Sequence, residues 1–197
     1  DTKLFTPLLI GITKGGKWVS LENNYPLAIV NKVMPTIEDN GTSVELAQGG
    51  VVINGSFVKI DCIFSILHGE FGEDGKIQQL LEDAHIPYVG SGVKASADAM
   101  DKALAKGLFS AAGLKVAPGI VVHKGEPHPD AQTISYPVFV KPSSGGSSRG
   151  THKVKTPDKL SAAIDDAFLY DSKVLIETAI NGREIECAVL ERDGTSY

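Results

Sequence analysis

The sequence has few cysteines, no long apolar run and no excess of positive charge, and each shortage excludes a class of protein. Two cysteines cannot form a disulfide framework, and because Cys62 and Cys187 both lie in apolar, strand-like runs, we expect two buried thiols in a reducing cytoplasm. No apolar run approaches the roughly 20 residues of a membrane span, so we expect no membrane partner. A net charge of −5 with mixed signs argues against a nucleic-acid partner.

What is present is the composition of an ordinary globular protein. The 197 residues are 42% hydrophobic and 22% charged, which suits one large or two small domains. Short apolar runs alternate with helical patterns, and this alternation predicts an α/β fold. The chain opens at Asp1 rather than at a methionine and ends on the turn-like ERDGTSY. We therefore expect a piece of a longer protein.

The first part of the chain predicts an open parallel sheet with helices. Candidate strands are PLLIGIT from Pro7, LAIV at residues 27–30 and DCIFSIL from Asp61. The segment after DCIFSIL carries one apolar stripe, formed by Ile77, Leu80, Leu81 and Ala84. This spacing of three and four residues predicts a helix, and IPYVGS then reads as a strand. Strand, loop, helix and strand together make a βαβ unit.

The second part predicts a small sheet with one helix packed on it. Residues 95–112 read as an alanine-rich helix that stops at Gly113. A second helix begins at the cap Thr156 and Pro157, and strands are expected in VAPGIVV, VFVK, KVLIET and REIECAVLE. These patterns divide the chain into an N-terminal α/β domain at 1–94, a small α+β central domain at 95–182 and the beginning of a C-terminal domain at 183–197.

A loop of Gly and Ser follows the strand VFVK, in the string VKPSSGGSSRG. Bare backbone N–H groups in such a loop can approach phosphate oxygens, and Lys141 at the strand end adds a fixed positive charge. The same composition also occurs in disordered surface hairpins, so the loop alone leaves both readings open. The chain has no GxxxxGK[ST] string, and GSGVKA from Gly90 matches a dinucleotide fingerprint that lacks its acidic residue.

Four strings in a fixed order carry a more specific signal. They are HGEFGEDGKIQQLLE, VGSGVKASADAMDK, VKPSSGGSSRG and LIETAINGRE. Together they resemble the ATP-grasp ligases and, among these, the D-alanine–D-alanine ligases, over nearly the whole chain from Asp61 onward. Two positions depart from the family pattern: Gln79 stands where glycine is usual, and Arg149 where a small apolar residue is common.

The resemblance implies an ATP site between two sheets, with the Gly-rich loop closing over the phosphates. It assigns Lys102 and Lys141 to the oxygens of the α- and β-phosphates. Gly146, Ser147 and Ser148 would supply backbone or hydroxyl donors to the phosphates, and Ser147 would also face the substrates. A mobile lid of this kind opens for exchange and closes to keep water from a reactive intermediate.

At the other end of the nucleotide, the resemblance assigns Glu177 to the adenine amino group. Backbone atoms of Thr178 and Ile180 would complete the contacts to the adenine edge, and Glu184 would hold the ribose hydroxyls. On the predicted strand REIECAVLE, Glu184 and Glu186 share one face, which suits either a ligand or plain solvent.

His68 ends a strand, at the edge of an α/β sheet where ligands bind. The resemblance places it in the D-alanine pocket, with Ser147 as the other catalytic candidate. A lone histidine is more often structural, so both roles stay open for His68. Glu73 and Asp74 read as helix-end residues first and functional residues second.

The activity implied by the resemblance is an ATP-dependent, magnesium-dependent joining of two D-alanines through an acyl phosphate, in the cytoplasm and for peptidoglycan synthesis. The metal ligands and an arginine of the family would follow Tyr197, so we expect the chain by itself to be inactive. Dimerisation through the first domain is a further expectation. A D-alanine–D-lactate or other ATP-grasp ligase, and a non-catalytic ATP-binding remnant, are the alternatives.

Overall fold

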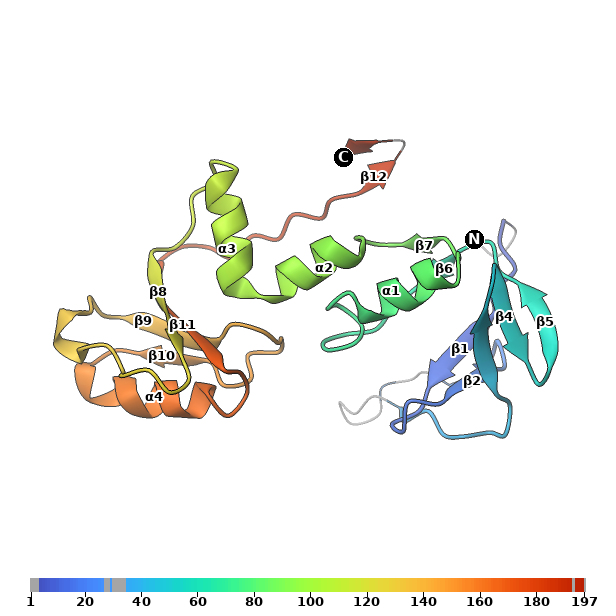
Figure 1. Cartoon of the computed structure of the whole chain (residues 1–197), viewed down its shortest axis with the longest axis horizontal. Helices are drawn as coiled ribbons and strands as arrows, with labels where there is room; N and C mark the ends of the chain where they lie inside the picture. The colour runs from blue at the N-terminus through green and yellow to red at the C-terminus, as the bar shows by residue number, and fades with distance from the viewer. Residues whose placement is uncertain (1–3, 27–28, 30–34, 193, 197) are drawn as a thin grey trace. The chain divides into compact units, whose positions relative to one another are not determined.

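The chain folds into two compact units, residues 1–99 and 100–197. The computed structural model describes residues 4–26, 29, 35–192 and 194–196, and each unit is considered by itself (Figure 1). The division lies within helix α2 (Val93–Met100). The finer division into three domains stays a prediction. Among the described residues, no helix has the length and apolar character needed to cross a membrane.

The first unit contains two antiparallel sheets and one βαβ unit. Its elements are β1 (Leu9–Ile12), β2 (Trp18–Leu21), β3 (Val44–Ala47), β4 (Gly50–Ile53), β5 (Ser56–Lys59), β6 (Ile63–Phe64), α1 (Lys76–Asp83), β7 (Tyr88–Val89) and α2. The βαβ unit predicted from the sequence is confirmed, because β6 and β7 pair in parallel across α1. The strand expected at residues 27–30 falls almost entirely outside the described residues.

Among the described strands of this unit, the predicted open parallel sheet is limited to the short pairing of β6 with β7, and the other strands pair antiparallel. The turn between β4 and β5 explains part of this arrangement. Asn54 and Gly55 both have positive φ, 48° and 81°, which is the geometry that an Asn-Gly pair favours in a two-residue hairpin. A local turn signal therefore sets an antiparallel hairpin in a region where the sequence showed no clean periodicity.

Both cysteines are exposed, so the expectation of two buried thiols is wrong. Cys62 lies just before β6, and this strand is only two residues long and pairs with β7 on one side. Cys187 lies in a segment without regular structure. An apolar neighbourhood in the sequence buries a side chain only where another element covers it, and neither segment is covered in this way.

The second unit is built on a four-stranded antiparallel sheet in the order β10-β9-β11-β8. Its elements are α3 (Lys102–Ala111), β8 (Gly119–His123), a 3-10 turn (Ala131–Thr133), β9 (Val138–Pro142), β10 (His152–Val154), a 3-10 turn (Pro157–Lys159), α4 (Leu160–Ala167), β11 (Lys173–Thr178), β12 (Glu191–Arg192) and β13 (Thr195–Ser196). The small sheet with a helix packed on it is therefore confirmed.

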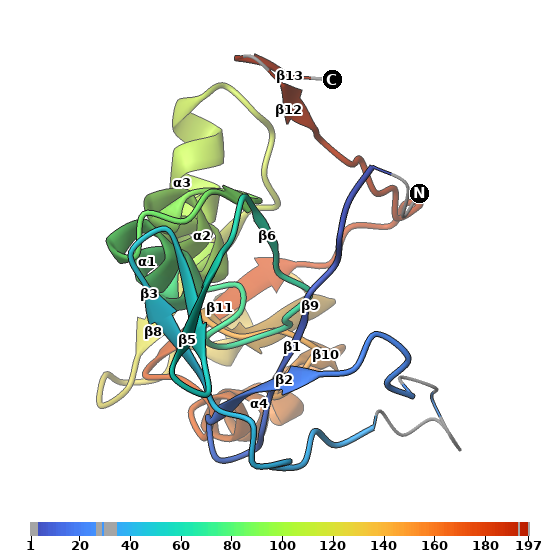
Figure 2. The same ribbon diagram turned by 90° about the vertical axis from the view of Figure 1, so that its right-hand side faces the viewer.

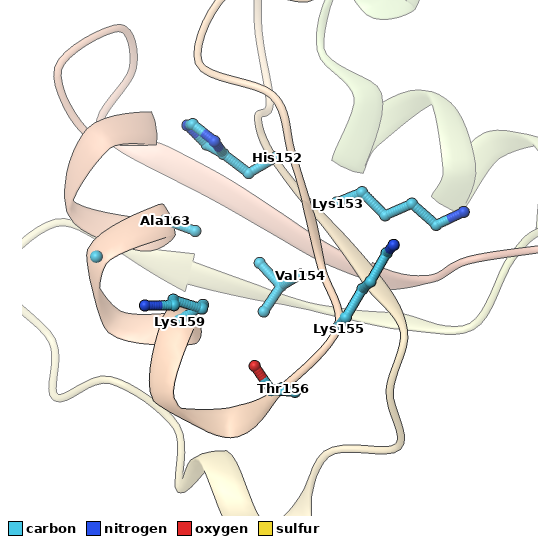
Figure 3. Close-up of a pocket in the computed structure, with 8 residues that line it drawn as sticks. His152, Lys153, Val154, Lys155, Thr156, Lys159 and Ala163 are labelled. Carbon is cyan, nitrogen blue, oxygen red and sulfur yellow. The ribbon is translucent and has the colours of Figure 1, made fainter.

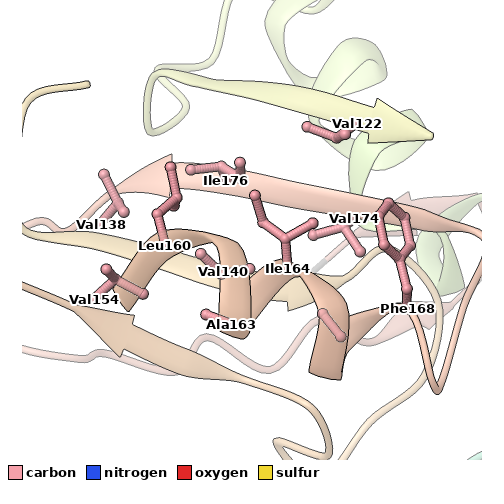
Figure 4. Close-up of a cluster of buried hydrophobic side chains, with 11 residues drawn as sticks. Val122, Val138, Val140, Val154, Leu160, Ala163, Ile164, Phe168, Val174 and Ile176 are labelled. Atoms are coloured by element: carbon pink, nitrogen blue, oxygen red, sulfur yellow. The ribbon is translucent and has the colours of Figure 1, made fainter. Parts of the chain in front are cut away.

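The core of this unit lies between α4 and one face of the sheet (Figure 4). The apolar stripe that the sequence predicts is buried, and its members are Leu160, Ala163, Ile164, Ala167 and Phe168. Alternate residues of the strands meet it, among them Val140 and Val174, which are both fully buried. Because side chains alternate along a strand, the residues between them point to the opposite face.

Helix α3 lies on that opposite side of the sheet, as Figures 1 and 2 both show. The sequence predicted one helix over residues 95–112, but α2 and α3 are separate. Asp101 has an extended backbone between them, and its carboxylate accepts from the amides of Ala103 and Leu104. This side-chain cap sets the start of α3 at Lys102, and it therefore fixes the position from which the Lys102 side chain projects.

The strand predicted at REIECAVLE is wrong for the described structure. Residues 179–190 have no regular structure, and only the short β12–β13 hairpin follows. Both edges of β11 are already taken by β8 and β9. An alternating pattern forms a strand only when a partner strand is present, and the described residues supply none here.

We expect Leu160→Ala to lower the free energy of unfolding by about 2–5 kcal/mol, because it removes a buried side chain from the α4 stripe. Leu169→Ala is the matched control, since 76% of Leu169 is exposed, and its effect should stay within about 0.5 kcal/mol. Urea unfolding followed by circular dichroism measures both. Equal losses for the two variants would contradict this account of the core.

Candidate functional site

Three residues singled out in the sequence come together on the face of the sheet that carries α3. Lys141 on β9 forms an ion pair with Glu177 on the neighbouring strand β11. The Lys102 ammonium donates to the carbonyl oxygens of Gly145, at 2.6 Å, and Ser143, at 3.3 Å. Burial and then the like charge of Lys141 lower the pKa of Lys102. Each ammonium group therefore lies within the electrostatic range of the other, and both lie at the base of the Gly/Ser loop.

A third lysine, which sequence reasoning missed, completes the group. Lys106 Nζ lies 2.7 Å from Glu177 Oε2 and 2.5 Å from the carbonyl oxygen of Ala117. It follows Lys102 by four positions on α3, and this spacing puts both on one helix face, which is the signal that could have found it. Burial raises the pKa of Glu177, but hydrogen bonds from Lys106 and Lys141 outweigh burial and hold that pKa below its ordinary value.

A polar cluster anchors the start of the Gly/Ser loop beneath these lysines. Ser143 is fully buried; its hydroxyl donates to Asp101 and accepts from the amide of Ala103. Lys173 forms an ion pair with the same carboxylate. Burial raises the pKa of Asp101, yet the bonds from Lys173 and Ser143 prevail and bring it down to about 2. The loop base is thus tied to the first turn of α3.

The rest of the loop is held at its two ends and is exposed in between. The amide of Ser144 donates to Asp171 at 2.7 Å, and the Arg149 guanidinium lies 5.4 Å from the centre of the Tyr170 ring. Ser147 and Ser148 both have left-handed φ angles, 54° and 55°. Among the described residues, none accepts a hydrogen bond from the amides of residues 145–148. Several backbone donors in the loop are therefore available to an anion.

Within the described structure, the remaining predicted site residues form no hydrogen bond or ion pair with these lysines or with the Glu177 carboxylate, although Thr178 is its neighbour on β11. Thr178 ends β11, where its amide donates to Pro118, and Ile180 is 69% exposed. Glu184 lies exposed in the irregular segment after β11, and nothing in the described chain brings it to Glu177. His68 belongs to the first unit, with its ring 3.8 Å from Glu73. The roles of these residues stay predictions.

The acidic residues after His68 stabilise their own turn. The carboxylate of Glu73 accepts from the amide of Gly69, and Asp74 accepts from the amides of Phe71 and Lys76. These contacts are local, within the loop that leads into α1. They agree with an interpretation of Glu73 and Asp74 as helix-end residues.

Among the cavities that adjoin the sheet of the second unit, one lies beside Lys106. It has a volume of about 290 Å³ and is lined by Lys106, Gly107, Ala117, Pro118, Val121 and Leu175, among others. Of the residues that surround Glu177, Lys106 lines this cavity, whereas Lys102 and Lys141 do not. A larger cavity, about 410 Å³, lies between β10 and α4 (Figure 3). There Lys153 and Lys155 point away from Lys159, so these charges do not converge.

Comparison with known proteins identifies the family. The model described as D-ala D-ala ligase N-terminus matches residues 1–91, and the one described as D-ala D-ala ligase C-terminus matches residues 108–196. A D-alanine–D-alanine ligase from Mycobacterium ulcerans is 43% identical over 97% of this chain and 55% of its own length. One from Rhodococcus erythropolis is 45% identical over 97% of this chain and 56% of its own length. The chain spans about half the length of these relatives.

Solved structures give the same result. The D-alanine–D-alanine ligase of Coxiella burnetii is 31% identical, with a TM-score of 0.86 over 100% of this chain and 60% of that one. The D-Ala:D-Ser ligase VanG of Enterococcus faecalis is 33% identical, with a TM-score of 0.79 over 92% of this chain and 55% of that one. Both likenesses support an α/β fold of the ATP-grasp kind.

We expect Asp101→Asn to destabilise the protein by about 2 kcal/mol near neutral pH, because Lys173 loses its ion pair. The folded-state pKa of Asp101, about 2, lies below its ordinary value of 3.8. The stability that this carboxylate contributes is therefore present above about pH 4 and is lost as the pH falls through 2.

The measurement is urea unfolding of the unsubstituted protein and of Asp101→Asn between pH 6 and pH 2. Asp165→Asn serves as the control, since 67% of the Asp165 side chain is exposed. A stability difference between the unsubstituted protein and Asp101→Asn that stays constant down to pH 2 would rule out this role for Asp101.

Proposed function

Because the chain belongs to the D-alanine–D-alanine ligase family, we propose that the protein carrying it is an ATP-dependent ligase that joins two D-alanine molecules for peptidoglycan precursor synthesis. The observation that carries the proposal is the convergence of Lys102 and Lys141 beside Glu177, at the base of the Gly/Ser loop. A cytoplasmic location, where ATP is supplied, and a possible homodimer belong to the same proposal.

Lys102 and Lys141 would bind the phosphates of ATP. Lys102 now donates to backbone carbonyls of the loop, and Lys141 now pairs with Glu177. Phosphate oxygens carry more negative charge than a carbonyl, so an entering triphosphate would draw both ammonium groups toward itself. The free amides of the loop, at Gly146, Ser147 and Ser148, would complete the cradle.

Glu177 would recognise the adenine amino group, because its carboxylate is held ionised and can only accept hydrogen bonds. Thr178 follows Glu177 directly in the chain and Ile180 lies three residues beyond it, which supports the proposal that their backbone atoms meet the adenine edge. Glu184, six residues beyond Thr178, would hold the ribose hydroxyls.

In the first step, a carboxylate oxygen of one D-alanine would attack the γ-phosphorus. The new P–O bond forms as the bond to ADP breaks, and the product is an acyl phosphate. The amine of the second D-alanine then attacks the carbonyl carbon, loses a proton, and expels phosphate. Closure of the Gly/Ser loop would keep water from the acyl phosphate, with Ser147 facing the substrates and His68 orienting one of them.

Magnesium is proposed for this reaction on the family alone. Among the described residues there is no group of three or more His, Cys, Asp or Glu side chains that could hold a metal ion. We therefore assign no magnesium ligand to this chain and derive no step from the metal.

The second substrate could differ from D-alanine. The likeness to a D-Ala:D-Ser ligase, at 33% identity, is close to that of the D-alanine–D-alanine ligase of Coxiella burnetii, at 31%. The main alternative within the family is therefore a ligase that joins D-alanine to a different second substrate, either D-serine or D-lactate.

We expect the whole protein to release ADP and phosphate from ATP when D-alanine is supplied, and to form the D-alanyl-D-alanine dipeptide. L-alanine should give neither product, and D-serine or D-lactate with D-alanine identifies the rival specificities. Coupled measurement of phosphate and chromatography of the product distinguish these cases. Absence of D-alanine-dependent ATP cleavage would favour a non-catalytic ATP-binding protein.

We expect Lys141→Met to lower kcat/KM for ATP by about 100-fold, because it removes a charge fixed beside the reacting phosphates. Lys155→Met is the matched control, since Lys155 is exposed and follows β10, a strand at the edge of the unit's sheet. Steady-state kinetics at varied ATP compare the two. If both variants kept the kcat/KM of the unsubstituted protein, Lys141 would have no part in binding phosphate.

A further inference from the structure

Among the described residues, Lys106 is the charged group in contact with Glu177 that the proposed function leaves unused. Its ammonium touches two acceptors, the Oε2 atom of Glu177 at 2.7 Å and the carbonyl oxygen of Ala117 at 2.5 Å. Only 20% of the Lys106 side chain is exposed, and only 13% of the Glu177 side chain. The ammonium therefore joins α3, the segment before β8, and β11 at a largely buried point.

The two lysines that hold Glu177 stand in different positions. In the proposed function Lys141 pairs with Glu177 and also binds the phosphates of ATP. In the structure its ammonium contacts the Oε1 atom of the Glu177 carboxylate. Lys106 contacts the other oxygen, Oε2, and its second contact is a backbone carbonyl. When Lys141 turns toward a phosphate, Lys106 remains to balance the charge of Glu177 and to keep the carboxylate in its orientation.

Orientation matters because the carboxylate can distinguish the two purines. Adenine carries an amino group at the position where guanine carries a carbonyl oxygen. A fixed carboxylate accepts from the amino group of adenine and repels the oxygen of guanine. A carboxylate that is free to rotate, or to become protonated, loses part of this discrimination.

We propose that Lys106 is a positioning residue, which holds the Glu177 carboxylate for adenine recognition and so favours ATP over GTP. The inference rests on the proposed function, and within that function it names the residue that sets base specificity. Lys106 acts through Glu177 and touches neither the phosphates nor the reacting atoms. Its loss should therefore affect nucleotide binding more than the chemical step.

The test uses the whole protein, with ATP and GTP as nucleotides and D-alanine-dependent phosphate release as the readout. Lys106→Met keeps the aliphatic stem and removes the charge. Lys106→Arg keeps the charge and can donate to both acceptors. Lys115→Met is the matched control, because Lys115 is exposed and forms no hydrogen bond or ion pair with another described residue.

We expect Lys106→Met to raise the KM for ATP by about tenfold, as befits the loss of one charged hydrogen bond, with kcat changed by less than about threefold. The preference for ATP over GTP should fall by a similar factor. Lys106→Arg should keep the KM for ATP and the preference for ATP over GTP close to those of the unsubstituted protein. Lys115→Met should change neither quantity. In a Glu177→Gln background, Lys106→Met should have little further effect, because the residue through which it acts is already altered.

Several outcomes would overturn the inference. They are an unchanged KM and base preference in Lys106→Met, a loss of kcat at constant KM, or additive effects of Lys106→Met and Glu177→Gln. If Lys106→Met does not fold, as judged by circular dichroism, Lys106→Gln replaces it with the same expectations. No D-alanine-dependent use of ATP by the unsubstituted protein would instead overturn the proposed function itself, and the inference with it.

Discussion

A carboxylate held between two lysine ammonium groups is the interaction on which the site depends. Glu177 lies between Lys106 and Lys141, and all three side chains are largely removed from water. Charges in such surroundings are tolerated only when they are paired and hydrogen-bonded, so removing any one of the three leaves the others poorly compensated. The group carries one net positive charge and lies next to Lys102. An anionic ligand can therefore enter and rearrange these pairs without leaving a buried charge alone.

The Gly/Ser loop combines a fixed base with a free centre. Ser143 is buried in a cluster with Asp101 and Lys173, and Gly150 is held close to the Tyr170 ring. Between these ends the backbone is exposed, and its amides have no acceptor in the described part of the chain. A loop that must close over a triphosphate needs both properties. The fixed ends set where it closes, and the free amides supply the donors.

Local patterns failed where the outcome depended on a distant partner. The alternation in REIECAVLE suggests a strand, yet both edges of β11 are occupied by β8 and β9. Cys62 and Cys187 lie in apolar stretches of the sequence but are exposed, because no element of the described structure covers them. One long helix was expected where Asp101 separates two. There the side chain of Asp101 caps α3 and also bonds to Ser143 and Lys173. The periodicity of apolar residues along a helix cannot predict these contacts, because both partners lie far away in the sequence.

The family, the order of the motifs, the buried stripe of α4 and the candidates Lys102, Lys141 and Glu177 could all be predicted from the amino-acid sequence. These features depend on residue spacing over short stretches of the chain. The contacts of Lys106 with Glu177, 71 positions away, and of Asp101 with Lys173, 72 positions away, could be found only in the folded structure. Such contacts arise when strands and helices pack, because packing brings together side chains whose separation along the chain carries no information about their distance in space.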